Sequence, residues 1–557
     1  MQKTSKMIKR ILNKTFVLSI ITATLSSILF ILAFPPQPHA DLAWICLIPI
    51  LIYCIHQSPK NSFLTALLCG LIFFGTKLFW VNNLLNFDFI AFWVILGWIL
   101  ISIYCALYFG VFGWLLSSFC RIIDKKIVGN GIVKTALHNI SIVIAAGIFW
   151  VGLEYIRAKI FTGFPWALLG TSQYQNLPII QIADIFGVYG ISCLIVIMNA
   201  GLTFVLLRFV YIYTKQKRPK IQFELFFALV CLLFAWQYGS KAIKQFRDTS
   251  QQKKIIISTV QPNIPQIIKW NPQEVNAILE TLRNQTDLAA QSSPSLILWP
   301  ETVLPSPINY DMYMKNFVDS IVKTNGIPIC LGSIEVKSEV FNEKTQKYDY
   351  EMSNSAFMIY TNGTQDIYRK NHLVMFGEYI PFENQIKFLK NISPLGFSCV
   401  PGKTFKSFEL NEEIKFSTLI CFEDIFSHLA AETAKNDADF IVNLTNDGWF
   451  DGTSLPIQHF SQSIFRSVET RRPLVRSTNS GITAFVQSDG SFVVLENEKN
   501  EFKFIGFMTY YLNLSKTPKH TPYVKYGDKP FAIPAMSLTI IAAIFFIIRK
   551  KQNKKNH

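Results

Sequence analysis

Long runs of apolar residues divide this chain, and they constrain its fold more than any other feature of the sequence. A helix of about 20 apolar residues is long enough to cross the hydrocarbon core of a bilayer. Eight runs approach or exceed that length, at about 16–34, 42–56, 63–81, 89–119, 139–156, 186–211, 224–240 and 531–548. The second run is short and the fourth is long, so we expect their boundaries to shift. The sequence therefore predicts a polytopic α-helical membrane domain.

The positive charge of the chain is concentrated at its two apolar ends. Residues 1–240 carry 18 Lys and Arg against 6 Asp and Glu, and residues 531–557 carry 5 against none. The middle, residues 241–530, carries 30 against 31. The net charge of +16 therefore belongs to the membrane segments. The nearly neutral middle disfavours a surface that binds nucleic acid.

Lysine and arginine also predict the orientation in the membrane, because cytoplasmic loops carry an excess of both. With the N-terminus in the cytoplasm, the cytoplasmic segments hold 20 Lys and Arg, whereas the short opposite loops hold only Arg157 and Lys159. Seven crossings then place 241–530 on the extracytoplasmic side, and the eighth returns the basic tail to the cytoplasm. The first run is similar to a secretory signal with cleavage at Ala40. Its 19 apolar residues are too many for a typical signal, so we expect a retained helix.

The polar middle of the chain is long enough for one large domain. Its β-branched runs, such as KKIIISTV, SLILWP, FSTLICF and DFIVNL, alternate with helix-compatible stretches such as 272–290 and 455–469. This alternation predicts mixed α/β structure with a substantial core. We expect a membrane domain over 1–240, an extracytoplasmic domain over 241–530, and a C-terminal transmembrane helix with a basic tail over 531–557.

Cysteine usage and short motifs exclude several kinds of site. Seven of the ten cysteines lie in or beside apolar segments, which leaves Cys330, Cys399 and Cys421 in the middle and predicts no disulfide framework. The sequence has no CxxC pair, no HExxH, no GxGxxG and no Walker-type loop, so neither a metal nor a nucleotide cofactor is indicated. Three histidines lack metal-like spacing and are interpreted as structural: His372, His428 and His459.

Three polar residues stand at the ends of strand-like runs, where α/β folds present their site residues. Glu301 follows SLILWP, Lys370 follows the strand around IYR, and Cys421 lies inside FSTLICFED. A nucleophilic cysteine needs a base, and the oxyanion that it creates needs a positive or donor group. Each residue also has an ordinary interpretation, as a solvated lysine, a helix-start carboxylate and a core cysteine. Spacing alone makes the constellation a hypothesis.

Several motifs in this order resemble the nitrilase superfamily. They are WPE at 299–301, YRKNHLVMFGEYIPFE at 368–383, LICFEDIF at 419–426, NLTNDGWF at 443–450 and RSVETRRPLVRSTNSGIT at 466–483. Their combination with a polytopic membrane domain and the loop TGFPWALLG resembles the apolipoprotein N-acyltransferase family. The resemblance covers essentially the whole chain. It implies an αββα sandwich, the nitrilase-like fold, for the extracytoplasmic domain.

The resemblance implies a catalytic triad of Glu301, Lys370 and Cys421. In this hypothesis the glutamate is the general base, the cysteine is the nucleophile and the lysine stabilises the tetrahedral intermediate. Glu378 and Glu423 match two further carboxylates of the family. A buried ammonium needs partner carboxylates, so we expect both to support it, the alternative being that they cap local elements.

Three other positions carry expectations from the same resemblance. Trp270 of PQIIKWNP matches a tryptophan that could pack a mobile arm over the acyl chain, the alternative being a core or interface tryptophan. Asn354 in SNSAF resembles an asparagine near the acyl site. Trp166 lies in the loop 157–178, which is either an interfacial anchor or a lid-like segment that touches lipid.

The chain departs from the family pattern at three positions. Met375 stands where the family often has proline, Phe422 where it often has tyrosine, and Gly448 where it often has alanine. Phe422 keeps the aromatic ring but lacks the hydroxyl, so any hydrogen bond made by that hydroxyl is absent here.

The resemblance implies a ping-pong acyl transfer at the inner membrane, with the catalytic domain on the periplasmic side. A membrane phospholipid donates the chain and the diacylglyceryl-modified cysteine of an apolipoprotein accepts it; no cofactor, nucleic acid or partner subunit is expected. The alternative is a membrane-tethered nitrilase-type amidase that acts on a small amide. A non-catalytic scaffold or a transporter is less favoured, because the triad is intact and intramembrane charge is sparse, with Lys77, Glu154 and Asp184 as its main sources.

Overall fold

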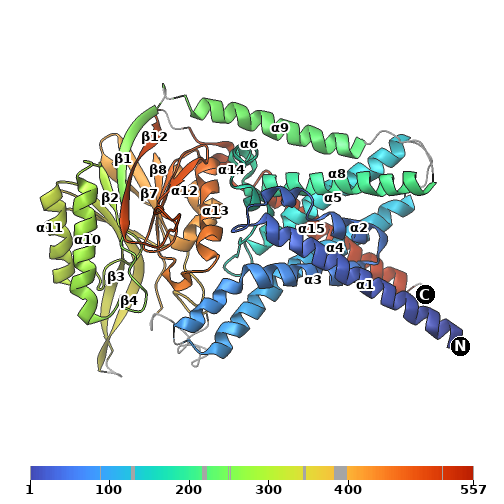
Figure 1. Cartoon of the computed structure of the whole chain (residues 1–557), viewed down its shortest axis with the longest axis horizontal. Coiled ribbons are helices and arrows are strands. Elements are labelled where there is room, and N and C mark those ends of the chain that lie inside the picture. Colours follow the sequence, from blue (N-terminus) through green and yellow to red (C-terminus); the bar gives the residue numbers. More distant parts are fainter. Residues whose placement is uncertain are drawn as a thin grey trace. The chain divides into compact units, whose positions relative to one another are not determined.

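Figure 1 shows the computed structural model of the chain, which describes residues 2–87, 89–126, 132–215, 223–248, 250, 252–342, 346–381, 398–516 and 519–555. The chain divides into two units. The first comprises Met1–Asn82, Phe92–Lys241 and Asp528–His557, and the second comprises Asn83–Ala91 and Ala242–Gly527. The short segment Asn83–Ala91 thus groups with the second unit, although it lies between two long apolar helices.

The first unit is built from helices. In chain order these are α1 (Gln2–Ala33), α2 (Ile48–His56), α3 (Pro59–Lys77), α4 (Ala91–Lys126), α5 (Ile132–Arg157), α6 (Leu177–Ile180), α7 (Ala183–Phe186), α8 (Val188–Lys215), α9 (Phe223–Phe246) and α15 (Ala532–Lys555), with 3-10 turns η1 (Ala40–Trp44), η2 (Phe79–Asn86) and η3 (Leu169–Gln173). The last residues of η2 and α9 and the first residue of α4 fall in the second unit. Within the described residues, seven helices are long and apolar enough to cross a membrane. The prediction of a multi-pass helical domain is therefore confirmed.

The predicted span at 42–56 is wrong as a single long helix. This run forms the five-residue turn η1 followed by α2, which has nine residues. At 1.5 Å per residue, α2 is about 14 Å long, roughly half of the hydrocarbon thickness. Pro49 lies in the first turn of α2, inside the apolar run, and Pro59 begins the next helix three residues after α2 ends. The charge-based orientation counts seven crossings before residue 241, so it requires this segment to complete a crossing and stays a prediction.

Charged side chains inside the first unit have internal partners. The Lys77 ammonium donates to the carbonyl oxygens of Phe34 and Pro35 at 2.9 and 3.0 Å. Glu154 accepts from the backbone N–H of Leu169 at 2.7 Å. These contacts hold the charged groups within the packed helices. They give no support to a transport pathway.

The second unit contains two six-stranded sheets. The first has the order β12-β1-β2-β3-β4-β5 and the second has the order β11-β10-β9-β8-β7-β6. Their strands are β1 (Gln252–Gln261), β2 (Leu296–Leu298), β3 (Ile329–Asn342), β4 (Lys347–Ile359), β5 (Gln365–Arg369), β6 (Ser407–Asn411), β7 (Ile414–Ile420), β8 (Phe440–Thr445), β9 (Leu474–Thr478), β10 (Ala484–Val486), β11 (Phe492–Val494) and β12 (Gly506–Ser515). Strands β1, β2 and β3 pair in parallel, as do β7, β8 and β9.

Helices cover the outer face of each sheet. They are α10 (Val275–Ala290) and α11 (Met312–Asn325) on the first sheet, and α12 (Ser427–Lys435) and α13 (Leu455–Thr470) on the second, with α14 (Pro522–Tyr526) beside the latter pair. Figure 1 shows α10 and α11 on one side of the sheets and α12 and α13 on the other. The predicted αββα sandwich is therefore confirmed.

The alternation of side chains along buried strands explains this layering. In β2, Leu296 and Leu298 belong to the core between the two sheets, whereas Ile297 belongs to the core under α10 and α11. In β3, Cys330 faces the inter-sheet core and its neighbour Leu331 faces the helices. Because successive side chains point to opposite faces, a strand buried on both sides is apolar throughout.

Candidate active site

The three residues of the predicted triad follow the ends of three strands. Glu301 follows β2, Lys370 follows β5, and Cys421 follows β7 directly. The Lys370 ammonium lies 3.6 Å from Glu301 Oε1 and 2.9 Å from Glu378 Oε1. Its side chain is 1% exposed, so the ion pairs are shielded from water. The structure therefore brings two carboxylates and one ammonium together at one end of the sandwich.

Asn354 of β4 joins the two carboxylates. Its Nδ2 donates to Glu301 Oε1 and to Glu378 Oε1, both at 2.7 Å. The backbone carbonyl of Asn354 also accepts from the N–H of Lys370 at 2.9 Å. Two negative groups close together repel, and the amide donor and the ammonium offset that repulsion. We call Glu301, Asn354, Lys370 and Glu378 the triad cluster.

The backbone around Glu301 is held by a close contact with β3. A Cβ built on Gly332 would lie 2.5 Å from Glu301 Cα and 2.7 Å from the backbone nitrogen of Thr302. The Gly332 N–H donates to the carbonyl of Pro300 at 3.1 Å. Glycine therefore lets β3 approach the turn that carries the carboxylate. The second carboxylate oxygen, Glu301 Oε2, accepts from the N–H of Asn446 at 2.9 Å.

Cys421 occupies a strained backbone position. Its φ is +50°, in the left-handed region, and it begins the 3-10 turn η7 (Cys421–Ile425) directly after β7. The carbonyl oxygen of Cys421 accepts from Asn443 Nδ2 at 3.1 Å. Strained residues of this kind persist where the surroundings fix them, and they cluster at functional sites.

The protonation states of the site follow from burial and neighbouring charge. Cys421 is partly exposed as a residue, yet burial of its thiol raises its pKa well above the usual range, Glu301 raises it further, and Lys370 partly opposes both. Burial alone lowers the pKa of Lys370, but Glu378 and Glu301 outweigh it and raise the pKa above its usual value. The site therefore combines a neutral thiol with a permanent ammonium. Such a thiol becomes a nucleophile only when a base takes its proton.

The two additional carboxylates differ in what they contact. Glu378 pairs with Lys370, and its other oxygen accepts from the N–H of Val374 at 2.8 Å. Glu423 instead accepts from the backbone N–H groups of Ile420, Asn371 and His372 at 2.8, 2.7 and 3.0 Å. Burial raises the pKa of Glu423 to about 7, although these donors lower it. Glu423 thus ties the loop after β5 to the turn after β7.

The remaining predicted residues lie around or outside this cluster. The Phe422 ring packs edge-on against Phe426 at a centroid distance of 5.4 Å. Trp270 is 44% exposed, with the Lys269 ammonium 5.4 Å from its ring centroid. Trp166 belongs to the first unit, where it is buried against Trp80 at 5.3 Å. It is therefore not part of the group that the second unit assembles.

The departures from the family pattern have separate surroundings. The N–H of Gly448 donates to Asn446 Oδ1 at 3.1 Å, and a Cβ at this position would lie 2.9 Å from the same oxygen. Alanine here therefore requires Asn446 to move. Met375 forms an isolated bridge with Tyr379, and nothing in the structure explains its exchange for proline.

Sequence reasoning missed two contacts of the site. The Lys269 ammonium donates to Thr302 Oγ1 at 2.6 Å, and burial lowers the pKa of Lys269 to about 8. The Asn446 N–H holds Glu301. The signals were Lys269 beside the expected tryptophan and Asn446 within the motif NLTNDGWF.

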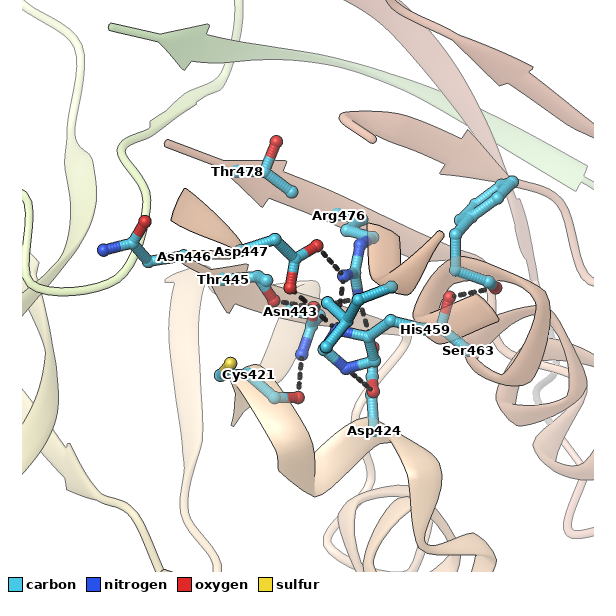
Figure 2. Close-up of polar contacts among 12 residues, drawn as sticks. Cys421, Asp424, Asn443, Thr445, Asn446, Asp447, His459, Ser463, Arg476 and Thr478 are labelled. Carbon is cyan, nitrogen blue, oxygen red and sulfur yellow. Dashed lines mark hydrogen bonds and ion pairs between the residues drawn. The ribbon is translucent and has the colours of Figure 1, made fainter. Parts of the chain in front are cut away.

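A second group of buried charges lies beside Cys421 and was also missed (Figure 2). We call it the clamp cluster; it consists of Asp424, Asp447, His459 and Arg476, each at most 3% exposed. Arg476 was detectable as a charge inside the strand-like run PLVRST. His459, interpreted as a structural histidine, is hydrogen-bonded to both aspartates. Among the described residues, no group of three or more His, Cys, Asp or Glu side chains could hold a metal ion.

Comparisons with known proteins cover both units. Residues 26–201 match a family model described as apolipoprotein N-acyltransferase N-terminal domain, and residues 256–503 match one described as carbon-nitrogen hydrolase. An apolipoprotein N-acyltransferase of Geobacter metallireducens is 33% identical over 477 residues, which is 84% of this chain and 85% of the relative. One of Haemophilus influenzae is 27% identical over 551 residues, 98% of each chain. A solved amidase from Nesterenkonia sp. has a TM-score of 0.33 and 16% identity, covering 49% of this chain and 92% of that chain.

Proposed function

Because the chain belongs to the apolipoprotein N-acyltransferase family, we propose that it moves an acyl chain from a membrane phospholipid to a lipoprotein. The acceptor is the α-amino group of the diacylglyceryl-cysteine at the lipoprotein N-terminus. The reaction proceeds in two steps through a thioester on Cys421. The product is a triacylated lipoprotein.

In the first step Cys421 attacks the sn-1 ester of the phospholipid. The Glu301 carboxylate takes the Sγ proton as sulfur bonds to the carbonyl carbon. The Lys370 ammonium stabilises the resulting oxyanion. The C–O bond then breaks, the leaving oxygen receives the proton held by Glu301, and a lysophospholipid departs.

In the second step the acceptor amine attacks the thioester carbon. Glu301 removes a proton from the amine nitrogen as the amide bond forms. The C–S bond breaks and the sulfur of Cys421 regains its proton. The thioester retains the activation of the ester, so the transfer needs no nucleotide and no metal.

The observation that carries this proposal is the pairing of a neutral thiol with a buried carboxylate–ammonium pair. Asn443 of β8 donates to the carbonyl oxygen of Cys421, and the N–H of Asn446 directly after β8 donates to Glu301, which supports one site for the thiol and the carboxylate. Burial and then Glu301 raise the pKa of Cys421, while Lys370 lowers it. A protonated thiol needs a base, which Glu301 can supply. The buried Lys370 ammonium, 3.6 Å from Glu301, can stabilise the negative charge that develops on the substrate oxygen.

The membrane unit favours lipid substrates over a small amide. Extracting an acyl chain into water costs about 0.8 kcal/mol for each CH₂ group, which a lipid-embedded enzyme avoids. The match of residues 26–201 to the N-acyltransferase N-terminal domain also disfavours a nitrilase-type amidase. We propose that the chain acts as a monomer in the inner membrane, with the second unit on the periplasmic side.

The test is intact mass spectrometry of the detergent-purified protein after incubation with phospholipid alone. The wild type gains a fatty-acyl mass that hydroxylamine removes, and Cys421→Ala gains none. Cys330→Ala is the matched control, because that thiol is also buried but lies in the core between the sheets. If phospholipid is bound and the wild type forms no adduct, the proposal is wrong and small amides become the substrates to test.

A further inference from the structure

Two loops hold the proposed nucleophile and base in place. The turn η7 after β7 carries Cys421 and, three residues later, Asp424. The loop after β8 carries Asn446, whose N–H donates to Glu301 Oε2 at 2.9 Å, and then Asp447. Each loop therefore has a reactive-site contact and a buried aspartate close together.

One arginine side chain from β9 binds both aspartates (Figure 2). Arg476 is 0% exposed. Its Nη1 donates to Asp424 Oδ2 at 2.6 Å, and its Nη2 donates to Asp447 Oδ2 at 3.0 Å. The planar guanidinium suits this arrangement, because it presents its donors in a fixed fork that the single ammonium of lysine lacks.

The same guanidinium also reaches the backbone of the nucleophile. Arg476 Nη1 donates to Asn443 Oδ1 at 3.0 Å, and Asn443 Nδ2 donates to the carbonyl oxygen of Cys421 at 3.1 Å. Asn443 lies opposite Arg476 in the pairing of β8 with β9. Arg476 is thus linked to the backbone of Cys421 through Asn443. Through Asp447 it is linked to the loop in which Asn446 binds Glu301.

His459 of α13 completes the link between the loops. Its Nε2 lies 2.8 Å from Asp424 Oδ1 and its Nδ1 lies 3.0 Å from Asp447 Oδ1. Burial of two carboxylates is costly unless cations and hydrogen bonds compensate it. The arginine and the histidine supply this compensation, so the clamp cluster fixes both loops against the same sheet.

We propose that Arg476 is a positioning residue that clamps the turn of Cys421 to the loop that holds Glu301. It touches neither the substrate nor a reacting atom. It holds Cys421 in the position and orientation from which Glu301 can take the thiol proton. This inference rests on the proposed function, because it assumes that Glu301 activates Cys421. Displacement of a reacting group by about 1 Å can slow a reaction about 100-fold.

The test compares Arg476→Lys with Arg472→Lys in the full-length detergent-purified protein. Arg472 is also buried, but it donates to the carbonyl oxygens of Ala438 and Lys519, away from both loops. We expect both variants to lower the melting temperature. Only Arg476→Lys should slow thioester formation, by about 10- to 100-fold with an unchanged KM for phospholipid. It should also change the pH profile of Cys421 alkylation by iodoacetamide.

A second variant keeps the idea testable if Arg476→Lys does not fold. Asp447→Asn retains the shape of the side chain and weakens one arm of the clamp, so it should slow the same step by a smaller factor. If the wild type forms no thioester, the proposed function fails, while alkylation of Cys421 still reports on the clamp without an acyl donor. If the folded variants match the wild type in thioester formation and in the pH profile, Arg476 has no positioning role.

Discussion

The triad cluster and the clamp cluster contain similar charged groups, but we expect them to have different roles. Both bury two carboxylates close together in the second unit. The triad cluster compensates them with one ammonium and one amide, whereas the clamp cluster supplies a guanidinium and an imidazole. Lys370 brings one positive charge to two glutamates, whereas two basic side chains face the two aspartates of the clamp cluster. The comparison teaches that an incompletely compensated pair supports chemistry, while a fully compensated pair supports rigidity.

The largest effect should follow from removing the uncompensated charge. Glu301→Gln keeps the shape of the side chain but cannot take the thiol proton, so thioester formation should slow by about 10²- to 10⁴-fold. Glu335→Gln is the matched control, because that buried carboxylate pairs with Arg369 rather than with Lys370. Single-turnover kinetics with phospholipid measure the rate. A rate for Glu301→Gln within threefold of the wild type would mean that Glu301 is not the general base.

A medium effect should come from moving the triad cluster without changing its charges. Gly332→Ala places a methyl group 2.5 Å from Glu301 Cα, so the backbone has to shift. We expect a stability loss of about 1–3 kcal/mol, measured by thermal unfolding, and slower thioester formation. Gly363→Ala is the control, because it adds only backbone strain at φ +82° in open space. Equal rates in the two variants would show that the position of Glu301 tolerates displacement.

The smallest effect should come from the clamp cluster and should depend on pH. Burial alone lowers the pKa of His459, but Asp424 and Asp447 outweigh burial and the opposing Arg476 charge, and they raise that pKa above its usual value near 6.5. The folded state therefore favours the imidazolium. Its stabilisation is complete below the usual pKa and is lost as the pH rises through the raised pKa.

The variant His459→Gln tests the direction in which this stabilisation changes with pH. The stability difference from the wild type should be on the order of 1 kcal/mol in acid and should shrink as the pH rises. Melting temperatures across neutral pH measure it. His520→Gln is the control, because that imidazole is partly exposed and 3.9 Å from Asp437. A difference that grows with pH would mean that His459 is neutral when the protein folds.

Much of the fold could be predicted because its signals are local. Apolar runs predict spanning helices by length, and β-branched runs that alternate with helix-compatible stretches predict mixed α/β structure. The sandwich itself was an expectation from the family resemblance. The run at 42–56 forms η1 and α2 rather than one long helix, because hydropathy does not register that Pro49 favours a helix start within the run. The count of eight runs is therefore one more than the seven helices of spanning length among the described residues.

The site was predictable at strand ends and less so between strands. Glu301, Lys370 and Cys421 each follow a strand, so position alone suggested them before the resemblance gave them roles. The partners of a buried charge come from distant residues that no spacing reveals. Arg476 binds Asp424, which is 52 residues away in the sequence, and Asp447, which is 29 residues away. From the sequence alone, Arg476 is only an unexplained charge in a strand.

The backbone of Cys421 has a consequence for the evolution of this chain. A residue with a side chain at φ +50° costs about 1–3 kcal/mol, and glycine avoids most of that cost. The fold by itself would thus prefer the one residue that has no thiol to offer. Selection for thermal stability alone would therefore favour glycine over the proposed nucleophile, and we expect selection for activity to retain the cysteine.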